Sequence, residues 1–82
     1  MAISRFEVDV ANQLAYFHLG NKEISGTQAI SDDINVDFDL DGCPVGLELI
    51  GLKTSIPNER LIADFGFTQK DLNEIARLLA NL

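Results

Sequence analysis

Residues 34–49 read Ile-Asn-Val-Asp-Phe-Asp-Leu-Asp-Gly-Cys-Pro-Val-Gly-Leu-Glu-Leu, and their alternation decides the fold class. Apolar and polar residues alternate with period two on both sides of an Asp-Gly turn, which is typical of a β-hairpin. A four-residue loop at 40–43 places Asp39 opposite Pro44, Asp37 opposite Gly46 and Asn35 opposite Glu48. These six residues share one face, and the other face carries Ile34, Val36, Phe38, Val45, Leu47 and Leu49.

Residues 37–48 also satisfy the calcium-loop pattern D-x-D-x-D-G-x5-E. An EF-hand loop needs a helix on each side, whereas the flanks here have the period of strands. In the hairpin, Glu48 lies about 13 Å along the partner strand from the rung of Asp39, at about 3.3 Å per residue. Calcium–oxygen distances of about 2.3–2.6 Å exclude joint ligation by these two residues. A metal site at Asp37, Asp39, Asp41 and Glu48 is therefore the alternative to a solvated hairpin.

The composition predicts one globular domain over residues 1–82. Hydrophobic residues make up 46% of the chain and charged residues 23%, which is outside the range of disordered sequences. No apolar run is long enough for a membrane span, and no apolar segment follows the N-terminal Arg5 as in a secretory signal. One cysteine allows no internal disulfide, so we expect a cytoplasmic protein.

The net charge of −7 belongs entirely to the first part of the chain. Residues 1–50 carry nine acidic and two basic side chains, whereas residues 51–82 carry four of each. This balance argues against direct binding of nucleic acid or of an anionic membrane surface. It favours either a basic protein partner or a solubilising role. The partner-binding residues that we predict are Asp32, Asp33, Asp37, Asp39, Asp41 and Glu48.

The rest of the first half predicts three more strands. Alternation indicates strands at residues 5–10, 14–19 and 23–30, separated by turns at 11–13, 20–22 and 31–33. Parallel pairing would need a crossover of a dozen residues or more, so short turns predict antiparallel neighbours. The expected fold is therefore α+β, with an antiparallel β-meander of about five strands over residues 4–52.

The second half predicts helix. Residues 56–65 form a short helix or a loop with Pro57 in its first turn. A clearer helix spans 68–82, with Thr68 as N-cap, Asp71 in a capping-box position and Phe67 able to pack on Leu72. Its apolar stripe is Leu72, Ile75, Leu78, Leu79 and Leu82. We expect this one C-terminal amphipathic helix to pack on one face of the sheet; sealing a dimer is the alternative.

Two segments resemble a family of small bacterial domains of unknown function. They are Leu-Ala-Tyr-Phe-His-Leu at 14–19 and the hairpin at 36–50, where Asp37, Asp39, Gly42, Val45, Gly46 and Glu48 match a DxDxxGxxVGIEIL-like pattern. Gln13 and Ala15 depart from the family's usual Asp and Leu. The resemblance covers about residues 5–52. It implies a small sheet, no established catalytic activity and frequent encoding beside small toxin-like proteins.

The sequence predicts no catalytic residue and no cofactor. His18 lies mid-strand with no serine or cysteine motif near it, which favours a local hydrogen bond over general-base chemistry. A zinc site from Cys43, His18 and two carboxylates would lack paired spacing. Glu48 is expected in a central strand, held by hydrogen bonds within the sheet. The predicted function is thus a non-enzymatic protein-interaction domain, such as an antitoxin-like or other inhibitor of a cationic nucleic-acid-handling protein. The alternative is a metal- or small-ligand-binding domain that uses the Asp37–Glu48 segment.

The sequence also predicts a homo-oligomer. A single helix covers one face of the sheet, and the expected register leaves apolar side chains on the other face. These side chains are Ala15, Phe17, Leu19, Ile50 and Leu52.

Overall fold

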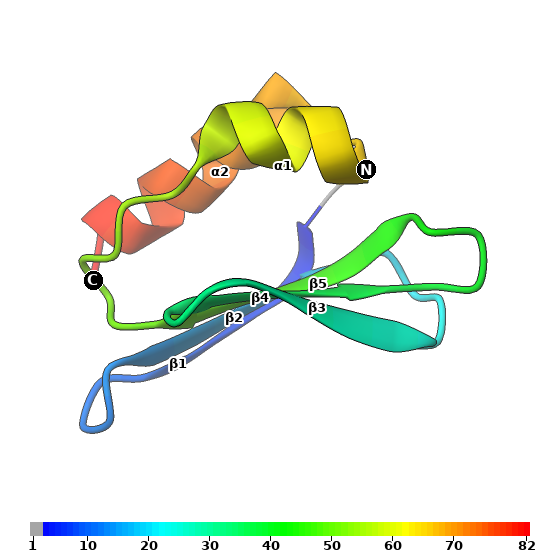
Figure 1. The fold of residues 1–82 in the computed structure, drawn as a ribbon. Helices are drawn as coiled ribbons and strands as arrows, with labels where there is room; N and C mark the ends of the chain where they lie inside the picture. Colours follow the sequence, from blue (N-terminus) through cyan, green and yellow to red (C-terminus); the bar gives the residue numbers. More distant parts are fainter. Residues whose placement is uncertain (1–2) are drawn as a thin grey trace.

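A five-stranded antiparallel sheet carries two helices on one of its faces, which confirms the α+β class (Figure 1). The computed structural model describes residues 3–82, so the first two residues of the predicted domain, and of the segment judged to lack a signal, lie outside the described residues. The elements are β1 (Ile3–Asp9), β2 (Leu14–Leu19), β3 (Gly26–Ser31), β4 (Ile34–Phe38), β5 (Pro44–Ile50), α1 (Asn58–Phe65) and α2 (Gln69–Ala80).

The strand order is β1-β2-β5-β4-β3, so the predicted meander is wrong in its order. All four neighbouring pairs are antiparallel, as expected. The strands β3, β4 and β5 follow one another as hairpins, and β2 lies beside β5, which is a Greek-key arrangement. The last strand of the sheet in the sequence therefore lies at its centre.

The segment between β2 and β3 makes this order possible. It was predicted as a tight turn at 20–22, but residues 20–25 run without regular structure from β2 to the far edge of the sheet. Three strand spacings of about 4.8 Å amount to about 14 Å, which six residues span easily at about 3.3 Å each. Hence the connection needs no crossover helix.

The predicted hairpin register is confirmed over most of its length. Asn35 pairs with Glu48 and Asp37 with Gly46. The register then shifts by one residue, because Pro44 pairs with Phe38 instead of Asp39. Asp39 is 5% exposed rather than solvated, and its Oδ1 accepts the N–H groups of Asp41 at 2.9 Å and of Cys43 at 3.0 Å. The Asp39 carboxylate thus stabilises the turn by accepting hydrogen bonds from its backbone.

Two helices cover the sheet instead of one. Residues 56–65, predicted as a short helix or a loop, contain α1. Gly66, with a φ of 75°, caps the C-terminal end of this helix. The N-cap of α2 is as predicted, since Thr68 Oγ1 accepts the Asp71 N–H at 3.1 Å. The helix ends at Ala80, so the predicted end at 82 is two residues too long. Neither helix within residues 3–82 has the length and apolar character needed to cross a membrane.

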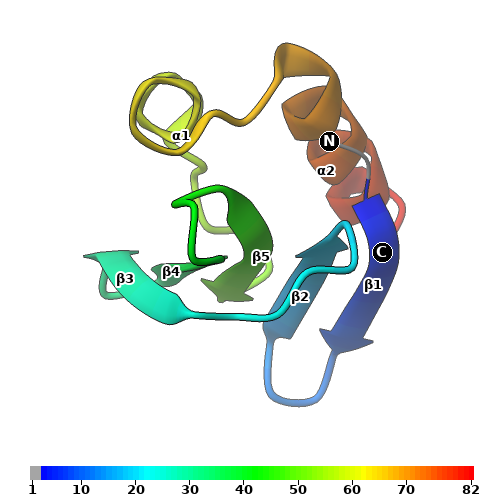
Figure 2. The ribbon, with the colours of Figure 1, turned by 90° about the vertical axis from the view of Figure 1, so that its right-hand side faces the viewer.

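The core lies between the sheet and both helices. Figure 2 shows α2 on the β1–β2 side and α1 on the β3–β5 side. Ala15, Phe17 and Leu19 are at most 2% exposed and belong to this core, so their predicted place on the uncovered face is wrong. Phe6 stacks on Phe17 with ring centroids 4.7 Å apart. Leu52 also packs against this core, whereas Ile50 is 40% exposed as predicted. The predicted homo-oligomer thus loses most of the apolar face on which it was based, and the oligomeric state itself stays a prediction.

The β4–β5 turn generates a stability prediction. Gly42 has φ of 81°, and a Cβ built there would meet no heavy atom within 4 Å, so a substitution acts through backbone strain alone. Because a β-branched residue resists this conformation at about 1–2 kcal/mol or more, we expect Gly42→Val to lower the melting temperature by about 5–15 °C.

The exposed Cys43→Ser is the control, and it should leave the melting temperature within about 2 °C of wild type. Gly42→Asn should fall between the two, because asparagine tolerates positive φ. Equal melting temperatures for Gly42→Val and Cys43→Ser would contradict the turn geometry.

Candidate functional site

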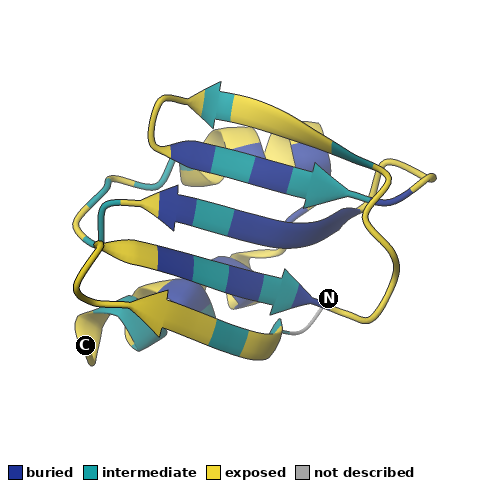
Figure 3. Ribbon diagram, turned by 90° about the horizontal axis from the view of Figure 1, so that it is seen from below, coloured by how far each residue is buried: buried dark blue, intermediate teal, exposed yellow. Residues whose placement is uncertain are grey.

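No helix covers the sheet face turned to the viewer in Figure 3, and the outward side chains at its centre are mostly polar. Period-two alternation sends Phe17, Leu47 and Val36 into the core and their neighbours in sequence to the opposite face. The outward neighbours on the three central strands are Tyr16, His18, Gly46, Glu48, Asn35 and Asp37. Several of them bond across strands, so this outer face is a hydrogen-bonded layer.

One tyrosine bridges three strands at the centre of this face. Tyr16 on β2 extends across Gly46 on β5, and its hydroxyl donates to Asp37 Oδ2 on β4. A Cβ at Gly46 would lie 1.8 Å from the Tyr16 hydroxyl oxygen, so only glycine leaves room for this path. Asp37 Oδ1 also accepts from the Thr27 hydroxyl on β3. Both oxygens of the Asp37 carboxylate therefore accept hydrogen bonds within the sheet.

This environment changes the acidity of Tyr16. Burial raises the pKa of the phenol well above its usual value of 10.0, and the hydrogen bond to the Asp37 carboxylate raises it further. Burial disfavours the phenolate by desolvation, and the hydrogen bond stabilises the neutral phenol that donates it. The negative charge of Asp37 adds repulsion against the phenolate. Tyr16 is therefore a hydrogen-bond donor, which is the opposite of what an activated tyrosine base requires.

Two further pairs extend the layer. The amide of Asn35 donates to Glu48 Oε1 at 2.8 Å, so the predicted role of Glu48 in a central strand is confirmed. His18 Nε2 lies 2.7 Å from Glu7 Oε2, which confirms the expected local hydrogen bond of this histidine. The hydrogen bond with His18 lowers the pKa of the exposed Glu7 carboxyl, with a further contribution from the charge of Arg5. None of these pairs supplies a nucleophile with an oriented base.

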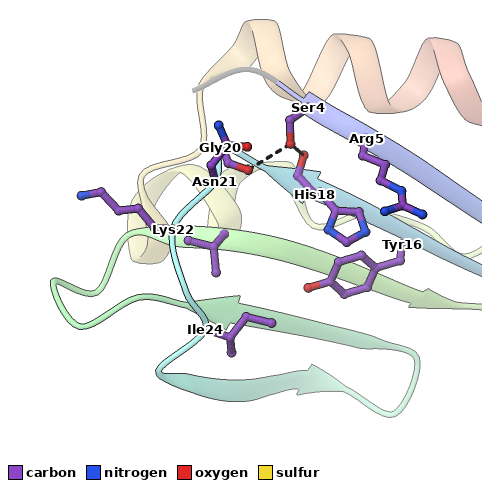
Figure 4. A pocket seen from close by; sticks show the side chains of 9 residues that line it. Ser4, Arg5, Tyr16, His18, Gly20, Asn21, Lys22 and Ile24 are labelled. Carbon is purple, nitrogen blue, oxygen red and sulfur yellow. Dashed lines mark hydrogen bonds between the residues drawn. The ribbon is translucent and has the colours of Figure 1, made fainter.

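A shallow pocket of about 400 Å³ lies where the layer meets the β2–β3 connection (Figure 4). Arg5 and His18 line it, but both are paired with Glu7. The Ser4 hydroxyl donates to the backbone carbonyls of His18 and Gly20. The side chain of Lys22 points away from Arg5 and His18 in Figure 4. The polar groups of this pocket do not converge on a common point.

A second, larger groove lies between the β2–β3 connection and the β4–β5 turn. It has a volume of about 560 Å³ and is lined by residues 21–25 and 39–41. Leu40 is 92% exposed at the tip of the turn, and Ile24 is 57% exposed on the connection. Both apolar side chains stand among the carboxylates of Glu23, Asp39 and Asp41. This groove is not predictable from local sequence patterns, because its two walls belong to segments distant in sequence.

The predicted partner-binding aspartates do not form one patch. Asp32 and Asp33 lie in the turn before β4, and Asp39 and Asp41 follow it at the other end. The six residue steps from Asp33 to Asp39 amount to about 20 Å along the strand. Asp37 lies between them and is bonded to Tyr16 and Thr27. Of the six predicted residues, Asp39 and Asp41 share the groove, and Glu48 faces Asn35.

A lysine from the β2–β3 connection lies beside two carboxylates of the calcium-like segment at 37–48. Lys22 Nζ lies 3.8 Å from Asp39 Oδ2 and 3.8 Å from Asp41 Oδ2. This ammonium pairs with two of the carboxylates that a metal ion would need, while Glu48 pairs with Asn35, away from the turn. Among residues 3–82, no three His, Cys, Asp or Glu side chains are grouped to hold a metal ion. Cys43 is exposed in the turn.

Fold and site together define a small α+β domain with a hydrogen-bonded polar sheet face and an acidic, partly apolar groove. The chain belongs to a family described as protein of unknown function (DUF2283), whose model matches residues 5–53. The matched residues include nearly all of the sheet and stop before α1. No curated protein and no solved structure matches the chain significantly.

The partly buried phenol of Tyr16 gives a prediction for alkaline titration. The chain has one tyrosine and no tryptophan, so the phenolate absorbance band, which lies at longer wavelength than phenylalanine absorption, reports Tyr16 alone. Since its pKa is raised in the folded state, the stabilisation is present below pH 10 and is lost as the pH rises above it. We expect phenolate absorbance to appear above pH 10, together with loss of structure.

Asp37→Asn should lower the Tyr16 pKa toward 10 without reaching it, because burial is the larger cause. Asp32→Asn, an exposed carboxylate in the β3–β4 turn, is the control and should leave the titration unchanged. Ionisation of the folded wild type at pH 10 would contradict the bridge across Gly46.

Metal addition generates a second prediction. Because the Lys22 ammonium already lies beside Asp39 and Asp41, millimolar calcium or a chelator should leave the melting temperature unchanged. Saturation at 100 times the dissociation constant would add about 2.7 kcal/mol. A calcium-dependent rise of several degrees would restore the Asp37–Glu48 metal site.

Proposed function

We propose that this chain is a small acidic, non-enzymatic protein-interaction domain that binds a basic protein partner. The observation that carries the proposal is the groove at the β4–β5 turn, where Leu40 is 92% exposed between two aspartates. An isolated exposed leucine needs no explanation, but here Ile24 is exposed on the opposite wall. Two apolar anchors inside an acidic rim resemble the centre and border of a protein interface.

The charges of the groove define the kind of partner. Its lining carries Glu23, Asp39 and Asp41 against Lys22, so the local balance is negative. The rest of residues 1–50 adds to the same field, which speeds association with a cationic surface. A partner segment that combines an apolar side chain with lysine or arginine is therefore complementary.

A cationic nucleic-acid-handling protein is the partner class that we propose in particular. Such proteins present basic surfaces to phosphate, and an acidic domain that occupies such a surface blocks access of the nucleic acid. The family resemblance, with its implied toxin-like neighbours, agrees with an antitoxin-like or other inhibitory role. The alternative of a metal- or small-ligand-binding domain gains no support from the Asp37–Glu48 segment, because Lys22 and Asn35 engage its carboxylates.

The proposal predicts that Leu40→Ser abolishes partner binding without affecting the fold. Leu40 makes no core contact at 92% exposure, so the melting temperature should stay within about 2 °C of wild type. The measurement is affinity purification from the native host, followed by binding assays of the purified partner at several salt concentrations. Leu82→Ser is the matched control, since Leu82 is also an exposed leucine, at 53%.

A supporting result is a partner of net positive charge that Leu40→Ser loses, Leu82→Ser retains and high salt weakens. A partner that both variants bind equally, at a rate independent of salt, would contradict the role of the groove.

A further inference from the structure

The two edge strands of the sheet differ in how they are protected. β1 carries Arg5, Glu7 and Asp9 within the strand, and its pairing with β2 shifts next to Ser4. Charges and bulges on an edge discourage the pairing of another strand. β3, with the sequence Gly-Thr-Gln-Ala-Ile-Ser, contains no charge and no proline. Figures 1 and 3 show β3 as the border of the sheet, with no other segment along its outer side.

Only the last two residues of β3 are blocked. Arg60 Nη1 on α1 donates to the backbone carbonyl of Ile30 at 3.2 Å, and the register shifts between Ala29 and Ser31. The first four residues, Gly26 to Ala29, have neither device among the described residues. Thr27, Gln28 and Ala29 are exposed, and Gly26 has no side chain to hinder approach. This leaves a four-residue stretch of backbone that is open to pairing.

The acidic groove continues into this open edge. Ser25 lines the groove and directly precedes Gly26. Glu23 lies before the strand, and Asp32 and Asp33 follow it, so carboxylates flank the uncharged edge at both ends. An extended segment with basic ends and an uncharged centre fits this arrangement. In an antiparallel pairing, a second copy of this chain would bring Asp32 and Asp33 toward the partner's Glu23, and the charge of −7 on each chain opposes it.

We propose that an extended segment of a basic protein partner adds a strand to the open stretch of β3 and continues into the groove at Leu40. Main-chain hydrogen bonds to the edge would supply affinity, and the flanking carboxylates would select the basic ends. This inference rests on the proposed function, because it names the form in which the partner binds.

The probe for the test is an acetylated and amidated peptide, Lys-Lys-Thr-Val-Thr-Val-Lys-Lys. It has a high strand propensity at the centre and the required charges at both ends. Backbone amide NMR and hydrogen exchange of the full chain are measured with and without it. We expect shifts at residues 26–29 and slower exchange of at least one edge amide there.

Two control peptides separate pairing from charge. Replacing both threonines by proline keeps the charge but removes donors and strand propensity, and should weaken binding at least tenfold. Replacing the lysines by glutamates should abolish binding. Equal binding of the proline peptide would overturn strand addition.

A matched pair of protein variants localises the site. Ala29→Lys places a charge on the open edge and should weaken peptide binding at least tenfold. Ala76→Lys makes the same change on the exposed face of α2, which Figure 2 shows on the β1–β2 side of the sheet, and should bind as wild type does. Both variants should keep the wild-type melting temperature. Equal binding by the two would overturn the inference.

The remaining outcomes distinguish this inference from the proposed function. Peptide shifts confined to 39–41 would overturn strand addition and leave the groove as a binding surface. Absence of shifts at millimolar peptide in both regions would overturn strand addition, whereas the Leu40 comparison would still decide the proposed function. Shifts at 26–29 that grow with protein concentration alone would identify a second copy as the occupant, and would overturn the basic partner.

Discussion

The central place of β5 is the constraint on which the rest of the structure depends. This strand pairs with β2 on one side and β4 on the other, and it buries Leu47 and Leu49 in the core shared with the helices. Because β5 is already hairpin-linked to β4, its free side must be filled by the β1–β2 pair. The chain between β2 and β3 then has to cross to the far edge. That crossing creates one wall of the groove and leaves β3 at the border of the sheet.

The outer face of β5 has the opposite requirement, because it must leave room for a neighbour. Gly46 places no side chain between Tyr16 and Asp37, so a phenol from β2 reaches a carboxylate on β4. A residue of any other type would put its Cβ into the Tyr16 hydroxyl. The same contact withdraws Asp37 from the charges available to a partner. Of the six predicted partner-binding carboxylates, those left exposed lie in turns and are Asp32, Asp33 and Asp41.

Local patterns predicted the local structure well. The alternation at 34–49 and the Asp-Gly turn specify which residues oppose one another, and Asn35 does face Glu48. Thr68 and Asp71 likewise specify the start of α2 through a bond between neighbours in sequence. In both cases the interacting groups are fewer than fifteen residues apart, so their spacing carries the information.

Non-local arrangement was not predictable by the same means. Period two shows that Ala15, Phe17 and Leu19 share a face, but the identity of that face depends on which strand lies beside β2. Assuming a meander gave the wrong neighbour and hence the wrong face. The groove was not predicted for the same reason. Ile24 and Leu40 line it together only because the β2–β3 connection crosses to the far edge of the sheet. The prediction that Asp39 is solvated is wrong because its carboxylate accepts backbone N–H groups of the turn instead of facing water.

The family match includes nearly all of the sheet but neither helix, so it distinguishes the elements that cover the core from the surfaces that we propose for binding. Residues 5–53 contain nearly the whole sheet, the crossing connection and the acidic turn, whereas α1 and α2 lie beyond it. The helices bury the apolar face through residues such as Leu61, Phe65 and Ile75, so their contribution is stability. A sheet with one exposed apolar face is unstable in water, so such a cover is needed whatever the domain binds. The surfaces that remain within the matched region are the polar outer face, the groove and the β3 edge. Internal hydrogen bonds engage much of the first, which leaves the groove and the edge as the surfaces that we propose for partner binding.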